Sequence, residues 1–247
     1  MLKVAPIRSA RPAGWSYDAV LLAALVGLTV GLAAGALLGL DVAIRDWVDA
    51  HRPAPAYWVA RGFNLLGQGG LVLVPVSVGL ALALARRSRS VRPVLLVAAT
   101  FALTFVTIGP AKVLTARAFP HGGGPHPERM FGNSVEATAY PSGHVANAVV
   151  WYSVIAVLLV ALLRAYGRRA PGGWAIRALR VGPPVAVFVA TTYLAYHWLT
   201  DAVAGLLLGL LLDRLLRRVP WDTVPLPGWL AGWRGPALDV ERSQVPG

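Results

Sequence analysis

Cysteine is absent from the 247-residue sequence, so disulfide bridges and thiolate-bound metal sites are excluded. Charged residues are scarce as well: only 14% are Asp, Glu, Lys or Arg, whereas soluble proteins contain about 25%. Acidic residues are the scarcer kind, 11 against 23 basic residues. In their place the chain has 56% hydrophobic residues and a mean hydropathy of +0.60. This balance excludes an ordinary soluble protein and indicates an integral membrane protein.

The formal net charge of +12 does not by itself indicate a nucleic-acid-binding protein. The basic residues lie between apolar runs and form no stripe with interleaved aromatic residues, which is the pattern that nucleic-acid binding requires. We therefore expect no nucleic-acid partner, and we interpret the basic residues as signals of membrane topology.

Six apolar runs are long enough, or nearly so, to cross a bilayer core of about 30 Å, which needs roughly 20 residues per helix. The first run follows a basic leader but has no convincing small-residue cleavage site, so we interpret it as a retained span and not as a signal peptide. We expect the last two runs to form a hairpin. The sequence thus predicts an all-α, polytopic membrane protein with six transmembrane helices, at residues 17–40, 57–85, 93–111, 143–163, 181–196 and 198–213.

The basic residues are divided unequally between the two sides of the membrane. Fifteen lie in the leader (Lys3, Arg8, Arg11), after the second and fourth runs, and after the sixth, whereas the alternate segments 41–56 and 112–142 hold five. Because positively charged segments stay in the cytoplasm, we expect both termini to be cytoplasmic. One membrane domain would cover residues 1–217. A Pro-, Gly- and Trp-rich tail, 218–247, would follow as a cytoplasmic or interfacial segment.

Three clusters of polar residues lie at ends of the apolar runs, all on the predicted extracytoplasmic side. Ionisable residues at such positions are costly and are functional candidates by default. Because the clusters come from separate segments and share one layer, we expect them to form one site. The clusters are Lys112 with Arg117, Ser142-Gly143-His144, and His197 with Asp201.

If the sixth helix begins near Tyr196, the i to i+4 spacing of His197 and Asp201 places both side chains on one face of it. The carboxylate can then accept a hydrogen bond from one ring nitrogen and leave the other nitrogen free to attack. The alternative is a structural His–Asp pair that closes a helix end.

Ser142, Gly143 and His144 precede an apolar run, as the start of a helix would. Unpaired N–H groups at a helix start bind anions, glycine admits a close approach, and a serine caps the helix, so the segment can hold a phosphate. An ordinary capped helix start with an interfacial histidine is the alternative.

For Lys112 and Arg117 the alternative is snorkelling of long side chains to the interface. We assign the remaining polar residues of this side to a solvated loop: His51, His121, His126 and Arg129.

Two histidines, one with a carboxylate partner, suit phosphoryl transfer through a covalent phosphohistidine when they lie beside basic side chains and a helix start. No Asp-rich motif is present to hold magnesium. We therefore expect a metal-independent reaction with no cofactor.

The order of a lysine, then P-S-G-H, then H-x3-D resembles the phosphatidic acid phosphatase type 2 superfamily of membrane lipid phosphatases, which is related to the vanadium-dependent haloperoxidases. The resemblance covers roughly residues 17–217. It implies a haloperoxidase-like helical core and a lipid phosphate substrate drawn from the bilayer. Polyprenyl phosphate or pyrophosphate, phosphatidic acid and phosphatidylglycerol phosphate are the candidate substrates.

The resemblance also implies the parts that individual residues play. His197 attacks phosphorus and Asp201 orients it, while His144 protonates the leaving lipid oxygen and water then hydrolyses the phosphohistidine. The phosphate oxygens are held by Lys112, Ser142 and the Gly143 backbone.

Both arginines of the family motifs are replaced. The first motif usually runs K-x6-R-P, but Phe119 precedes Pro120 here, and the third usually begins S-R, where this chain has Ala190-Thr191. We expect Arg117 to bind the substrate phosphate, with Arg129 as a further replacement for the missing charge. Two other functions fit the same residues: a lipid head-group phosphotransferase, and a non-catalytic membrane protein that binds a lipid phosphate.

Overall fold

The computed structural model describes residues 12, 14–131, 137–235 and 237–238, and all regular secondary structure among them is helical, as the sequence predicted. The basic leader residues Lys3, Arg8 and Arg11 lie outside the described residues. The eight α-helices are α1 (Ser16–Ala33), α2 (Leu38–Ala50), α3 (Ala54–Leu65), α4 (Val74–Ser88), α5 (Arg92–Thr115), α6 (Gly143–Ala165), α7 (Gly173–Tyr193) and α8 (Leu199–Arg218). A π turn, η1 (Gly69–Leu73), precedes α4, and two 3₁₀ turns, η2 (Trp221–Thr223) and η3 (Gly228–Trp233), follow α8.

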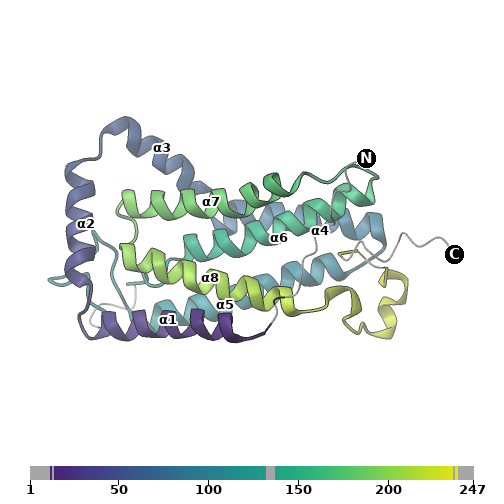
Figure 1. The fold of residues 1–247 in the computed structure, drawn as a ribbon, viewed down its shortest axis with the longest axis horizontal. Helices are drawn as coiled ribbons and strands as arrows, with labels where there is room; N and C mark the ends of the chain where they lie inside the picture. The colour runs from purple at the N-terminus through teal and green to yellow at the C-terminus, as the bar shows by residue number, and fades with distance from the viewer. Residues whose placement is uncertain (1–11, 13, 132–136, 236, 239–247) are drawn as a thin grey trace.

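Four of these helical segments are long and apolar enough to cross a membrane: α1, η1 with α4, α5 and α6. The chain is therefore a multi-pass membrane protein. The other two expected spans correspond to α7 and α8, which have 21 and 20 residues and run beside α6 (Figure 1). Each carries charged residues within its length, among them Arg177 and Arg180 in α7 and Asp213 in α8.

Helix α6 is the centre of the bundle, with 72% of its most apolar stretch buried. Helices α4, α7 and α8 pack against it, α1 packs against α8, and α5 packs against α4. Two glycines let α8 approach α6 closely. A Cβ at Gly205 would lie 2.5 Å from the Ser142 carbonyl oxygen, and one at Gly209 would lie 2.8 Å from Val149 Cβ. Small residues of this kind allow helix backbones to meet inside a membrane.

Two of the expected spans are interrupted. The first ends at Ala33, after which a turn containing Gly35 at φ +89° leads into α2. The run 57–85 divides into α3 and α4 around a glycine-rich turn, where a Cβ at Gly67 would lie 2.7 Å from Val187 Cγ1. Helix α2 lies across one end of the bundle, and α3 returns from it toward α7 (Figure 1).

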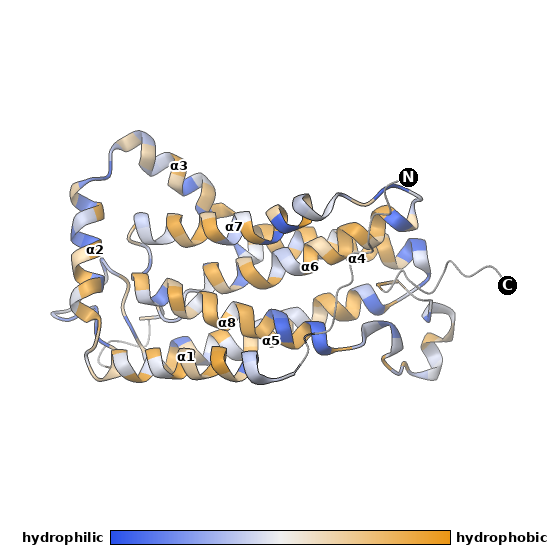
Figure 2. Cartoon of the chain, viewed as in Figure 1, coloured by the Kyte–Doolittle hydropathy of each residue, from blue (hydrophilic) through white to orange (hydrophobic). Residues whose placement is uncertain are grey.

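Hydrophilic residues gather at the opposite end of the bundle (Figure 2), where the last turns of α4, α6 and α8 contain arginines. There Arg214 and Arg218 both pair with Asp18, which joins α8 to α1. The segment after α8 folds back onto the α4–α5 turn. Nη1 of Arg92 donates to the Trp221 carbonyl at 2.9 Å and to the Val224 carbonyl at 3.0 Å.

Candidate active site

The three polar clusters meet at the end of the bundle that α2 covers. Lys112 lies in the last turn of α5 and His144 in the first turn of α6. His197 precedes α8, which begins at Leu199, so the expectation that His197 and Asp201 share one face of a helix is wrong and the pair spans the helix start. The rings of His144 and His197 lie 6.0 Å apart between centroids. The structure therefore places the candidate acid and the candidate nucleophile on adjacent helix ends.

Backbone hydrogen bonds join the segments that carry these residues. The Ser142 N–H donates to the Asp201 carbonyl at 2.9 Å, and the Ala139 N–H donates to the Arg117 carbonyl at 2.9 Å. The Tyr140 hydroxyl shares a 2.6 Å hydrogen bond with Thr29 of α1, and burial raises the pKa of that hydroxyl. The site is thus built on a framework in which loop and helix ends fix one another.

The start of α6 has the features of an anion site. Ser142 is fully buried, and its hydroxyl oxygen accepts from the Val145 N–H at 3.4 Å as the N-cap. A Cβ at Gly143 would lie 3.5 Å from Lys112 Cε, so the lysine side chain runs beside the glycine. The Lys112 ammonium donates to the Thr138 carbonyl. A cation and the first N–H groups of a helix therefore lie side by side, which suits a phosphate.

His197 is 4% exposed, and its Nδ1 lies 3.6 Å from Asp201 Oδ2. The same carboxylate oxygen accepts from the Trp198 N–H at 3.1 Å. Nδ1 of His197 and Nε2 of His144 are both buried without a hydrogen-bond partner. Buried polar atoms are nearly always paired, so the unpaired Nε2 of His144 is typical of a group that acts on a substrate, whereas Nδ1 of His197 faces Asp201.

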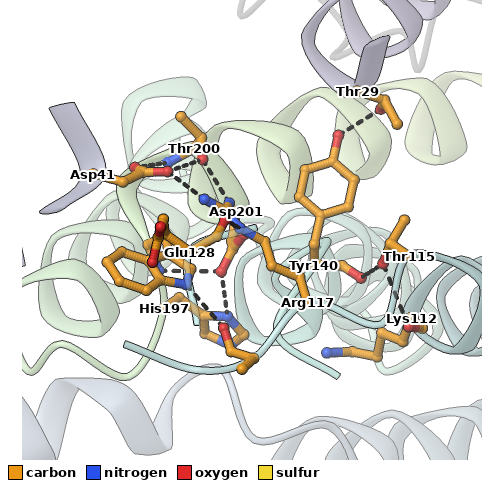
Figure 3. A network of polar contacts seen from close by, with 12 residues as sticks. Thr29, Asp41, Lys112, Thr115, Arg117, Glu128, Tyr140, His197, Thr200 and Asp201 are labelled. Carbon is orange, nitrogen blue, oxygen red and sulfur yellow. Dashed lines mark hydrogen bonds and ion pairs between the residues drawn. The ribbon is translucent and has the colours of Figure 1, made fainter. Parts of the chain in front are cut away.

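The Arg117 guanidinium is not a free cation directed at the anion site at the start of α6. Its side chain is fully buried, pairs with Asp41 and Asp201 at 2.6 Å each, and also donates to Thr200 (Figure 3). Its Nε donates to the Glu128 carbonyl at 2.9 Å. This placement argues against the expectation that Arg117 binds the substrate phosphate.

The positions of the two missing motif arginines carry no charge. The Phe119 ring lies 5.6 Å from the His197 ring, edge to face. Thr191 is fully buried in α7, and its carbonyl accepts from the His197 N–H at 3.3 Å. Arg129 is exposed in the loop after α5. Among the residues assigned to the phosphate, Lys112 therefore supplies the cation.

Sequence reasoning missed Asp41 and Thr200. Asp41 is 1% exposed, and its carboxylate accepts from the Thr200 N–H at 3.0 Å and from the Thr200 hydroxyl. One signal was available: Asp41 shares a helical face with Val48, and a carboxylate on the apolar face of an amphipathic helix needs a buried partner.

A cavity of about 250 Å³ opens beside the site between η1, α4, α5 and α6. Ile108 and Asn147 in its wall lie about one helical turn from Lys112 and His144. The rest of the wall is mainly apolar or small: Gly69, Gly70, Val74, Phe101, Thr104, Phe105, Gly109 and Trp151.

Within the described part of the chain, no group of three or more His, Cys, Asp or Glu residues is arranged to hold a metal ion. The side chains gathered here can instead supply a nucleophile, an acid and an anion cradle.

A family model described as PAP2 superfamily matches residues 76–225, which include all three clusters. The fold is similar to a solved structure, "Crystal structure of the first transmembrane PAP2 type phosphatidylglycerolphosphate phosphatase from Bacillus subtilis". The TM-score is 0.65 at 23% sequence identity, over 81% of this chain and 93% of that one. No curated protein matches the sequence.

Proposed function

The chain belongs to the PAP2 superfamily, and from this premise we propose that it removes phosphate from a membrane lipid, without a metal, through a phosphohistidine. The observation that carries the proposal is the 6.0 Å approach of His144 and His197 beside Lys112: Nε2 of His144 is unpaired, and Nδ1 of His197 faces Asp201.

In the proposed reaction His197 Nε2 attacks phosphorus while its Nδ1 faces Asp201. The N–P bond forms as the bond from phosphorus to the lipid oxygen breaks, and His144 gives its proton to that oxygen. Water then attacks the phosphohistidine, His144 takes the proton from the water, and inorganic phosphate leaves. This cycle needs one acid and base and one nucleophile, which the two histidines supply.

The phosphate oxygens would lie against the start of α6. The Lys112 ammonium, the Ser142 hydroxyl and the Gly143 N–H converge there, and Gly143 leaves room for an oxygen close to the backbone. Fixed donors of this kind stabilise the charge of the transition state because they need no reorientation during the reaction.

The apolar cavity beside Lys112 and His144 supports a lipid as the substrate. We assign it to an acyl or prenyl chain, whose phosphate then reaches the two histidines. The candidate substrates are polyprenyl phosphates and pyrophosphates and phosphatidates. Phosphatidylglycerolphosphate is a further candidate, and it is supported by the similar Bacillus subtilis structure, which is described as a phosphatase of that lipid.

We further propose that α7 and α8 are the fifth and sixth spans and that the site faces the extracytoplasmic side. The arginines in the last turns of α4, α6 and α8, at the bundle end opposite the site, support this orientation. Both termini would then be cytoplasmic.

The second candidate function is transfer of a lipid head group. It is favoured by one observation: the buried Arg117 is paired with two carboxylates, so Lys112 is left as the cation beside the α6 start. A phosphodiester carries one negative charge and a monoester up to two, and the diester is therefore better matched to this site.

The deciding experiment measures phosphate release from these lipids in EDTA, with wild type and His197→Ala. We expect release by wild type alone, and wild-type activity that disappears in EDTA would remove the metal-free mechanism. Head-group exchange between lipids without phosphate release would establish the transferase. Equal release by His197→Ala would remove the proposed nucleophile.

A further inference from the structure

Two buried carboxylates from distant parts of the chain share the guanidinium of Arg117. Nη1 of Arg117 donates to Asp201 Oδ1 and Nη2 donates to Asp41 Oδ2, each at 2.6 Å. With the bonds to Thr200 and Glu128, four of the five N–H groups of the guanidinium are engaged by protein acceptors. The guanidinium also lies over the Trp198 ring at 5.4 Å.

The Asp201 carboxylate is held at both oxygens. Oδ1 accepts from Arg117, whereas Oδ2 accepts from the Trp198 N–H and faces His197 Nδ1. A carboxylate fixed at one oxygen by an arginine cannot rotate freely, so its second oxygen stays directed at the imidazole. The guanidinium thereby sets the direction from which His197 is oriented.

Asp41 holds Arg117 from outside the bundle. It belongs to α2, and it also accepts from the N–H and the hydroxyl of Thr200 in the first turn of α8. Helix α2 therefore caps α8 and fixes the guanidinium with one side chain. Since both carboxylates and the guanidinium are fully buried, solvent does not screen the arrangement.

We infer that Arg117 and Asp41 are positioning residues for the nucleophile: Asp41 holds Arg117, Arg117 holds Asp201, and Asp201 directs His197. Arg117 is then not a ligand of the substrate phosphate, and α2 is part of the active site. This inference rests on the proposed function for its kinetic consequence, while the orientation of His197 can be measured separately.

The first test compares wild type with Asp41→Asn, Arg117→Lys and Arg117→Ala, using purified full-length protein and the lipid phosphate that wild type hydrolyses best. The matched control is Asp46→Asn, which changes an exposed aspartate of the same helix. We expect each of the three variants to lower kcat by roughly tenfold or more, with KM within about twofold of wild type, because a misdirected nucleophile slows chemistry and not binding.

Two further readouts separate positioning from phosphate binding. Added guanidinium should restore part of the rate of Arg117→Ala, and orthovanadate should protect that variant from thermal unfolding at the same concentration as wild type. A rise of about tenfold in KM or in the vanadate concentration would instead make Arg117 a phosphate ligand and overturn the inference. If Arg117→Ala does not fold, Asp41→Asn and Arg117→Lys provide the test. An unchanged kcat in both variants would then overturn the inference.

The last readout does not depend on turnover. In ¹⁵N-histidine-labelled protein, with the His197 signals assigned by their loss in His197→Gln, we expect wild type to hold neutral His197 with its proton on Nδ1. Asp41→Asn should populate both tautomers, and identical spectra of the two proteins would refute the positioning. If wild type hydrolyses no lipid phosphate, the proposed function fails while these spectra still decide the inference.

Discussion

The backbone N–H of Ser142 donates to the carbonyl of Asp201 at 2.9 Å, so the anion cradle and the orienting carboxylate belong to one hydrogen-bonded unit. The contact exists because α8 lies against the start of α6 at Gly205. The distance between His144 and His197 is therefore set by helix packing as much as by the residues that do the chemistry.

Replacing Gly205 with alanine should loosen this unit. The added Cβ would lie 2.5 Å from the Ser142 carbonyl oxygen, so the helices must move apart. We expect a loss of about 1–3 kcal/mol in stability and a lower kcat. Thermal unfolding measures the stability, and turnover of a lipid phosphate measures kcat. Gly182→Ala in α7 is the control, since a Cβ there meets nothing within 4 Å. Equal behaviour of the two variants would contradict the packing argument.

Loss of His144 should be tolerated by substrates that need no proton on the leaving group. In His144→Gln we expect hydrolysis of a lipid alkyl phosphate to fall roughly 10²–10⁴-fold, as general acids contribute that much. A substrate with a nitrophenol leaving group should still phosphorylate His197 rapidly, and a burst of nitrophenol measures this step. Absence of the burst would show that His144 is needed for a step other than protonation of the leaving group.

Filling the cavity should change chain preference. Gly70 lies in its wall and has space for a side chain, so Gly70→Leu should raise KM for long-chain lipid phosphates more than for short-chain ones. Gly79→Leu, in α4 and also free of close neighbours, is the matched control. KM measured across a chain-length series compares them. An equal change in KM for all chain lengths would show that the lipid chain binds outside this cavity.

Restoring the arginine of the first motif should favour doubly charged phosphates. Phe119 lies against His197, so Phe119→Arg brings a guanidinium to the nucleophile. We expect KM for a phosphate monoester to fall by about tenfold, since a hydrogen bond between charged groups contributes roughly 1.5–3 kcal/mol. Phe119→Leu controls for loss of the ring. If both variants bind monoesters equally, the charge shortage at this position has no consequence for binding.

The sequence was most informative where chemistry and local spacing coincide. The apolar runs and the distribution of basic residues placed the His197–Asp201 pair and the P-S-G-H stretch in a common layer without knowledge of any tertiary contact. The positions of other residues depend on contacts with residues that are distant in the sequence. Asp41 and Thr200 are 159 positions apart, and no local pattern predicts that they meet.

The division of the run 57–85 into two helices also depends on contacts between residues that are distant in the sequence. Its composition suits one long helix, but Gly67 packs against Val187 and His144 of other helices, and that contact fixes the turn. Arg117 was expected to face a phosphate because its charge was visible in the sequence. Its pairing with Asp41 and Asp201 depends on how α2 and α8 pack around it, which no local pattern predicts.

The bridge from Asp41 through Arg117 to Asp201 also bears on how the protein is made. Its three members, Asp41, Arg117 and Asp201, leave the ribosome in that order. The carboxylate of α2 has no α8 to cap until α8 has been inserted beside α6. We therefore expect His197 to remain undirected in a nascent chain until α8 packs against α6.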